Sequence, residues 1–181
     1  MKKNRLPVYV FIFLIAVTAF SMYGRTEIKE FPEGKTVSYL QSMQASITDI
    51  LNKVPVKQIE EEQVLSQDQS AILVEKSERI LSSFTELNSI AATYLSTDDS
   101  ESKTQSSLEN IYFSFSRLEG KKGSELKLTD RQVDYITDVY QFLADVRKID
   151  VFDIGLDESL HEMEKVSEQY PGLERRMEGT E

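Results

Sequence analysis

The feature that most constrains this chain is an uncharged apolar run near its N-terminus, at residues 6–23. As an α-helix, these 18 residues would extend about 27 Å at roughly 1.5 Å per residue, which nearly matches the hydrocarbon core of a membrane. Pro7 suits the first turn of such a helix, and Tyr23 suits the interface between lipid and water. The run therefore predicts a transmembrane helix rather than a helix buried in a globular core.

The charges around this run predict its orientation. Lys2, Lys3 and Arg5 precede it, whereas the basic residues after it are more dilute. Because positive flanks stay in the cytoplasm, residues 1–23 are expected to form a cytoplasmic tail and a single-pass anchor in the cell membrane, with the C-terminal domain outside. The alternative is a secreted protein with a cleaved signal peptide, because residues 17–21 offer small side chains at the spacing that a signal peptidase reads. The length of the run favours the anchor.

The remainder of the chain is acidic. Three of the 21 basic residues precede the apolar run and all 31 acidic residues follow it, so residues 24–181 carry 18 basic and 31 acidic groups, a balance of −13. Such a domain repels phosphate backbones, so no nucleic acid is expected as a partner, and cationic partners are favoured. The sequence contains no cysteine, which excludes disulfides, thiolate metal sites and a catalytic cysteine.

Apolar residues recur at helical spacing after the run, and no alternating strand pattern competes with them. Following a connector at residues 24–35, they predict an all-α domain, an antiparallel bundle of four or five helices at 36–175, and then a tail at 176–181. The five apolar stripes are Leu40, Met43, Ile47, Ile50 and Val54; Leu73, Ile80, Phe84, Leu87, Ala91 and Tyr94; Leu108, Ile111, Phe115 and Leu118; Val133, Ile136, Tyr140 and Leu143; and Leu156, Leu160, Met163 and Val166.

Local signals mark the ends of these helices. Pro55 should stop or kink the first one, and Ser66 or Asp68 is a candidate cap for the second. Thr129 and Gln132 have the spacing of a capping box at the start of the fourth helix. A glycine at position 155 separates the fourth helix from the fifth.

No catalytic, cofactor-binding or metal-binding constellation is predicted. His161 is the single histidine, and Lys165 stands where a zinc-protease motif needs its second histidine. Residues 34–36 (Gly-Lys-Thr) resemble the end of a phosphate-binding loop, but Lys29 replaces its required glycine, so no nucleotide is expected. Residues 100–103 (Ser-Glu-Ser-Lys) match the serine and lysine spacing of penicillin-recognising enzymes without their companion motifs. The chain is therefore not expected to be an enzyme.

An acidic cluster follows the fourth helix, at Asp150, Asp153, Asp157 and Glu158. Its oxygens could ligate a hard cation such as calcium, but the spacing does not match the EF-hand loop. A solvated turn that caps helices is the preferred interpretation.

Tyr112 and Phe113 form the candidate partner surface. Ile111 and Phe115 belong to an apolar stripe, so Phe113 between them should point away from the core. An exposed aromatic residue here would mark a partner surface, although packing of Phe113 against the first or last helix is the more common arrangement.

The sequence therefore predicts a membrane-anchored, extracytoplasmic helical protein that acts as a protein-interaction or scaffold module of a bacterial envelope. In layout only, a short basic tail, one span and an outer helical bundle also resemble the sensor half of bacterial transmembrane receptors. A ligand-sensing accessory subunit of a membrane complex is thus the alternative.

Overall fold

The structure, a computed structural model, describes residues 31–95, 102–119 and 125–177. The chain divides into two units, residues 1–31 and 32–181, and the second unit is described below. The predicted anchor or signal peptide lies outside the described residues, so it stays a prediction. Within the part that the structure describes, no helix combines the length and the apolar character that crossing a membrane requires.

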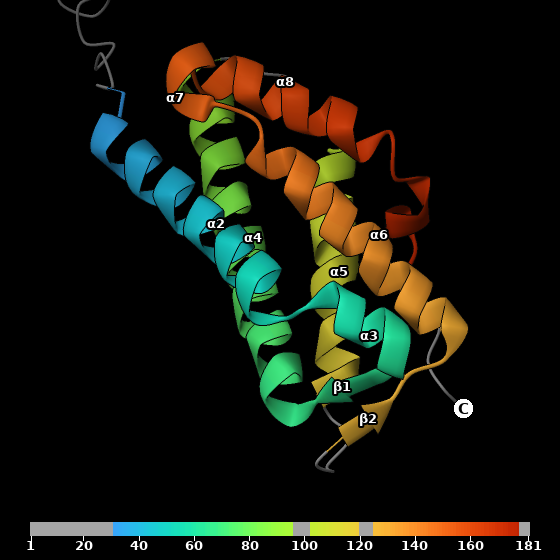
Figure 1. Cartoon of the computed structure of the whole chain (residues 1–181). Coiled ribbons are helices and arrows are strands. Elements are labelled where there is room, and N and C mark those ends of the chain that lie inside the picture. The colour runs from blue at the N-terminus through green and yellow to red at the C-terminus, as the bar shows by residue number, and fades with distance from the viewer. Residues whose placement is uncertain (1–30, 96–101, 120–124, 178–181) are drawn as a thin grey trace, which may run out of the picture. The chain divides into compact units, whose positions relative to one another are not determined.

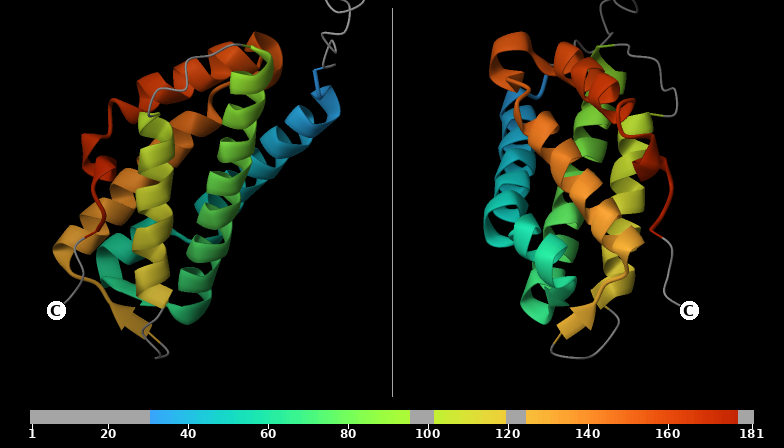
Figure 2. Two further views of the ribbon diagram at one scale, coloured as in Figure 1. Left: turned by 180° about the vertical axis from the view of Figure 1, so that it is seen from behind. Right: turned by 45° about the vertical axis from the view of Figure 1, so that its right-hand side comes forward.

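The described residues form seven α-helices, one 3-10 helix and one two-stranded sheet, which confirms the all-α class and a helical bundle. In Figures 1 and 2, α4 packs between α2 and α5, while α6 contacts α2 and α8. The elements in chain order are α2 (Glu33–Lys53), α3 (Val56–Glu62), β1 (Val64–Ser66), α4 (Gln67–Tyr94), α5 (Lys103–Glu119), β2 (Glu125–Lys127), α6 (Asp130–Arg147), α7 (Val151–Ile154), α8 (Leu156–Ser167) and the 3-10 helix η1 (Pro171–Glu174).

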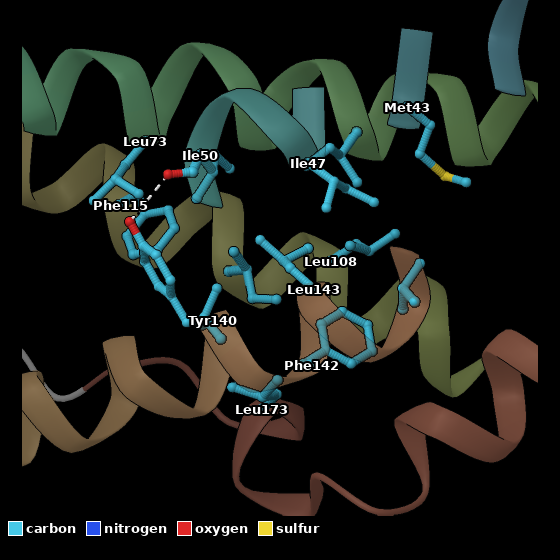
Figure 3. Packing of buried hydrophobic residues seen from close by; sticks show 14 of the residues in the cluster. Met43, Ile47, Ile50, Leu73, Leu108, Phe115, Tyr140, Phe142, Leu143 and Leu173 are labelled. Atoms are coloured by element: carbon cyan, nitrogen blue, oxygen red, sulfur yellow. Dashed lines mark hydrogen bonds between the residues drawn. The ribbon is translucent and has the colours of Figure 1, made fainter. Parts of the chain in front are cut away.

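The five predicted apolar stripes meet in one core, part of which Figure 3 shows. Every stripe residue is buried except Tyr94, Leu160 and Val166, which are half-buried. Burying one such large apolar side chain contributes about 1.5 to 3 kcal/mol, so this shared core dominates the stability of the bundle.

A polar anchor crosses this core from α6 to the end of α2. The Tyr140 hydroxyl donates to the backbone carbonyl of Val54 and lies 3.3 Å from that of Ile50 (Figure 3). The Ile50 carbonyl also accepts the Val54 backbone N–H over 3.1 Å, whereas the Val54 carbonyl lies just past the end of α2, where carbonyls lack partners within the helix. The hydroxyl therefore provides a hydrogen bond to the Val54 carbonyl, which is costly to leave unpaired when buried. Burial raises the pKa of Tyr140 above its ordinary value, which keeps the hydroxyl protonated as a donor.

Helices α4 and α6 each begin with a capping box, of which the one at Thr129 and Gln132 was predicted; at α4 the cap is Ser66, one of the two candidates. At α4, the Gln69 backbone N–H donates to Ser66 Oγ over 3.2 Å, and the Ser66 N–H donates to Gln69 Oε1 over 2.8 Å. At α6, Thr129 and Gln132 exchange the same pair of bonds over 3.3 and 3.0 Å. Each box satisfies two N–H groups that lack partners within the helix, so these local hydrogen bonds stabilise the start of α4 and of α6.

Helix α3 and strands β1 and β2 were not predicted, and neither were the short helix α7 and the 3-10 helix η1. Helix α3 lies in a stretch rich in Gln and Glu between the first two predicted helices, and its one buried residue is Ile59. Strands β1 and β2 pair antiparallel, with Leu65 opposite Leu126, so the expectation that no strand forms is wrong at these six residues. Strands of three residues are too short to show an alternating pattern, and their partners lie about sixty residues apart in the sequence.

The packed region is longer than residues 36–175. Helix α2 begins at Glu33, inside the expected connector, and the buried Thr36 hydroxyl donates to the Pro32 carbonyl over 3.1 Å. At the other end, Met177 is buried and its backbone N–H donates to Ser114 Oγ over 2.9 Å. Residues 176 and 177, expected to begin the tail, therefore lie against the folded domain.

Candidate interaction surfaces

The predicted partner surface on α5 is partly covered by the chain's own C-terminal segment. Phe113 is 41 % exposed and Tyr112 is half-buried, with their ring centroids 5.5 Å apart. The guanidinium carbon of Arg176 lies 4.5 Å from the centroid of the Phe113 ring. Such a cation–π contact contributes about 0.5 to 1 kcal/mol at an exposed site. A partner that stacks on this face of Phe113 would have to displace Arg176.

The C-terminal segment is held on α5 by hydrogen bonds. The Asn110 side-chain amide donates to the backbone carbonyl of Glu174 over 2.8 Å, and Ser114 accepts the Met177 N–H described above. Residues 173–177 therefore lie along α5 beside Phe113, and this contact within the domain limits how much of the predicted surface is open.

A second apolar surface lies on α7, which sequence reasoning passed over. Phe152 is 56 % exposed and Ile154 is 43 % exposed, more than any other large apolar side chain in the described part of the chain. Val151 is the one buried residue of this four-residue helix. A single helical turn has too few positions to bury both faces, so Phe152 and Ile154 are presented to solvent.

Both ends of α7 are fixed by local backbone signals. Asp150 caps its start, with Oδ1 accepting from the Asp153 N–H over 3.4 Å. Gly155 ends it with φ of +82°, a conformation that glycine adopts without the strain that a side chain would cause, and it leads directly into α8. The turn from Asp150 to Gly155 thus sets the orientation of Phe152 and Ile154.

Two other exposed apolar side chains come from segments that lie at the same end of the bundle as α7. Figures 1 and 2 place the start of α2, the end of α4 and α7 together at one end, opposite the end that holds α3 and the sheet. Val37 in the first turns of α2 and Leu95 just after α4 are each 39 % exposed. Among the residues that the structure describes, α3, β1 and β2 expose no large apolar side chain.

Carboxylates surround the apolar residues of α7. Asp150, Asp153, Asp157 and Glu158 are exposed, and none forms an ion pair with a basic side chain of the described residues. Asp157 and Glu158 lie in the first turn of α8, where the helix dipole favours negative charge. Within residues 31–95, 102–119 and 125–177, no three His, Cys, Asp or Glu side chains gather to hold a metal ion. The α7 surface is defined below as Phe152 and Ile154 together with these four carboxylates.

The packing of α8, which carries part of this surface, depends on Glu164. Its Oε1 accepts from the Lys103 backbone N–H over 2.7 Å, and its Oε2 accepts from the Thr104 N–H over 3.1 Å. The hydroxyls of Ser102 and Thr104 each donate to Oε2 over 2.9 Å. Glu164 thus satisfies the unpaired N–H groups at the start of α5 and joins α8 to it. Burial alone would raise the pKa of Glu164, but these hydrogen bonds outweigh it and hold the pKa below its ordinary value.

Replacing Glu164 by Gln should lower the free energy of unfolding by about 1 to 3 kcal/mol at pH 7, because an amide cannot accept four hydrogen bonds from these donors. Glu162→Gln, on the same helix, removes only the partly exposed pair with Lys165 and should cost roughly 0 to 1 kcal/mol. Urea melts of both variants measure the difference.

The Glu164 effect should also depend on pH. Its pKa is lower in the folded chain than its ordinary value of 4.5, so its stabilisation is present above that value and is lost as the pH falls through the folded pKa. A Glu164→Gln penalty that persists undiminished at pH 3, or no penalty at pH 7, would contradict this account.

The remaining residues singled out from sequence have structural positions. His161 is exposed on α8, as expected for a solvated helix residue. Ser102 accepts from the Gln105 N–H over 3.2 Å and so caps α5, and Lys103 pairs with Glu168 over 2.9 Å. Residues 34–36 lie within the helix α2 rather than in a phosphate-binding loop.

Comparisons with protein-family models, with curated proteins and with solved structures found no match to this chain.

Proposed function

We propose that this chain is a membrane-anchored, extracytoplasmic helical protein that serves as a protein-interaction or scaffold module of a bacterial envelope. The observation that carries this proposal is the α7 surface, where Phe152 and Ile154 are the most exposed large apolar side chains of the residues that the structure describes. Exposed apolar groups with a polar rim are typical of surfaces that contact another protein.

The membrane anchor is supported by the sequence. The apolar run at residues 6–23 has the length of a membrane span, and the basic residues that precede it favour a cytoplasmic N-terminus. The acidic domain that follows then acts outside the cytoplasm, where its charge keeps it soluble and disfavours contact with anionic lipid.

Photocrosslinking of the full chain in cells tests the interaction role. A photoreactive benzophenone amino acid replaces Phe152, Phe113 or Glu125 in three separate variants, where Glu125 is exposed on β2 at the opposite end of the bundle. The proposal predicts a discrete protein adduct from position 152 or position 113 and none from position 125. Absence of an adduct at both aromatic positions would overturn the proposal, and so would equal labelling at all three.

A further inference from the structure

Resting on the proposed interaction role, we infer that residues 172–177, called the C-terminal strap, act as an internal ligand. The strap covers a peptide-binding site on α5 and α6, and a partner protein fills this site with a short segment of the same chemistry. That chemistry is two apolar side chains four positions apart, with Lys or Arg just before the second. The strap therefore controls access to the site, because it competes with the partner.

The strap is held through its backbone, as a bound peptide would be. It comprises the end of η1, which contacts both α5 and α6, and the three residues that follow (Figure 2). The Asn110 side-chain amide donates to the backbone carbonyls of Glu174 and Leu173, over 2.8 and 3.4 Å. Ser114 Oγ accepts the Met177 N–H over 2.9 Å. Because side chains of α5 bind backbone groups here, another segment can make the same hydrogen bonds.

Two apolar side chains of the strap determine which segments fit the site. Leu173 is fully buried and Met177 is 6 % exposed, and both pack in the core cluster. The side chains of residues 174–176, which lie between them, are exposed. Buried anchors separated by exposed positions are the usual way in which a protein reads a short peptide. The site therefore selects an apolar pair at this spacing and tolerates variation between its members.

The surroundings of the strap favour a basic segment. The guanidinium carbon of Arg176 lies 4.5 Å from the centroid of the Phe113 ring, a position where a cation is attracted by the aromatic face. At the other end of the strap, Asp138 Oδ2 on α6 would lie only 3.4 Å from a Cβ atom built on Gly172. An acidic segment would lose the contact with Phe113 and would meet the Asp138 carboxylate, so we expect Lys or Arg in the partner.

The strap leaves part of the neighbouring aromatic surface uncovered, which distinguishes a partner from a second copy of this chain. Phe113 remains 41 % exposed beneath Arg176, and Tyr112 beside it is half-buried. A partner segment that continues along α5 gains contacts with these rings that the strap does not make. The strap of a second copy gains none, and it competes with a tethered strap whose effective concentration is on the order of millimolar. The occupant is therefore another protein.

Hydrogen exchange of the unmodified full chain, held in detergent, tests whether the strap opens on its own. The strap amides, among them the Met177 N–H bonded to Ser114, should exchange at least about a hundredfold faster than the amides of residues 80–87 on α4. The strap amides reach solvent by local opening, whereas those of α4 require unfolding of the domain. Equal exchange rates would overturn the inference, because a strap that never opens alone cannot control access.

Peptide binding tests the site itself. The released chain is full length and carries Leu173→Ser with Met177→Ser, which removes both buried anchors of the strap and leaves α5 and α6 unchanged. The probe is a fluorescent peptide with the sequence of residues 170–177, and its binding is measured by anisotropy. The matched control chain carries Phe152→Ser with Ile154→Ser, which removes two apolar side chains from α7 instead. Circular dichroism checks that both chains remain folded.

We expect the released chain to bind the peptide at least about tenfold more tightly than the unmodified chain or the α7 control, because the strap no longer competes. Adding Asn110→Leu to the released chain should weaken binding about fivefold, and Arg176→Gln in the peptide should weaken it about threefold. Equal binding by the released and unmodified chains, or binding that does not depend on Asn110, would overturn the inference.

Crosslinking in cells separates this inference from the interaction role. With the benzophenone amino acid at position 113, the substitutions Leu173→Ser and Met177→Ser should raise the yield of the protein adduct at least about threefold. An adduct confined to position 152, a yield at position 113 that release does not change, or an adduct with a second copy would overturn the inference alone. Absence of an adduct at both positions would remove the interaction role and the inference that rests on it.

Discussion

Truncating Phe84 to alanine should lower the free energy of unfolding by about 3 to 5 kcal/mol. Phe84 is 1 % exposed on α4, which packs between α2 and α5, and it stands between Ile80 and Leu87 in the longest apolar stripe. The truncation removes buried apolar area and leaves a cavity that neighbouring helices fill only in part. For a domain of this size, whose total stability is about 5 to 15 kcal/mol, this is a large share.

The matched control is His161→Ala, on α8. His161 is exposed and belongs to no apolar stripe, so its loss should change stability by roughly 0 to 1 kcal/mol. With a urea dependence of about 1 to 3 kcal/mol per molar, the two midpoints should differ by on the order of 2 M. Phe84→Leu, which keeps most of the volume, should fall between them and remain folded. Equal midpoints for the two alanine variants would mean that the assignment of the core face is wrong.

A chain reduced to residues 31–177 should form a soluble, predominantly helical domain without the apolar run. The core is closed within these residues, and both capping boxes are local, so nothing in the described packing requires residues 1–30. The comparison is a shorter chain of residues 36–175, which loses the Thr36 contact with Pro32 and the buried Met177. Removing Met177 alone should cost about 1.5 to 3 kcal/mol.

Circular dichroism and thermal unfolding measure both chains. The longer one should show a helical spectrum and one cooperative transition, and the shorter one should melt at a lower temperature. A spectrum of strand or coil from residues 31–177 would refute the all-α domain, and equal melting temperatures would refute the boundaries at Pro32 and Met177.

Sequence could predict the parts of this fold that depend on neighbouring residues. Thr129 and Gln132 are three positions apart, so their capping box is visible in the sequence, and Gly155 separates two helices because it adopts a positive φ. Ser77, the one polar break in the second stripe, is buried yet tolerated because its hydroxyl donates to the Val74 carbonyl over 3.0 Å.

Contacts between distant residues were not predictable in this way. Glu164 lies about sixty residues from the donors at the start of α5, and its position on α8 looks like that of any solvated glutamate. The pairing of Leu65 with Leu126 is equally remote. Such contacts depend on how the helices pack, which apolar periodicity does not specify.

Apolar periodicity predicted only part of the candidate interaction surfaces. Periodicity assigns apolar residues to the core, so it has no means of recognising Phe152 and Ile154, which occupy a turn too short to bury them. Phe113 was recognised because it interrupts a longer stripe, and it is exposed, although Arg176 lies over its ring. The usable signal for α7 was its setting, since Asp150 and Gly155 bracket two large apolar residues among carboxylates.

The most direct test of the central claim measures on which side of the membrane the helical domain lies. Because the chain contains no cysteine, His161→Cys introduces a single thiol at an exposed position of α8. The full-length protein is produced in cells, and the layers outside the cell membrane are permeabilised while the cell membrane is left intact. A membrane-impermeant maleimide is added to one sample before the cell membrane is lysed and to a second sample after lysis. The account predicts full labelling before lysis, on a protein that stays with the membrane pellet after alkaline washing and retains residues 1–23. Labelling that appears only after lysis, or a labelled soluble protein that begins near Phe20, would contradict it.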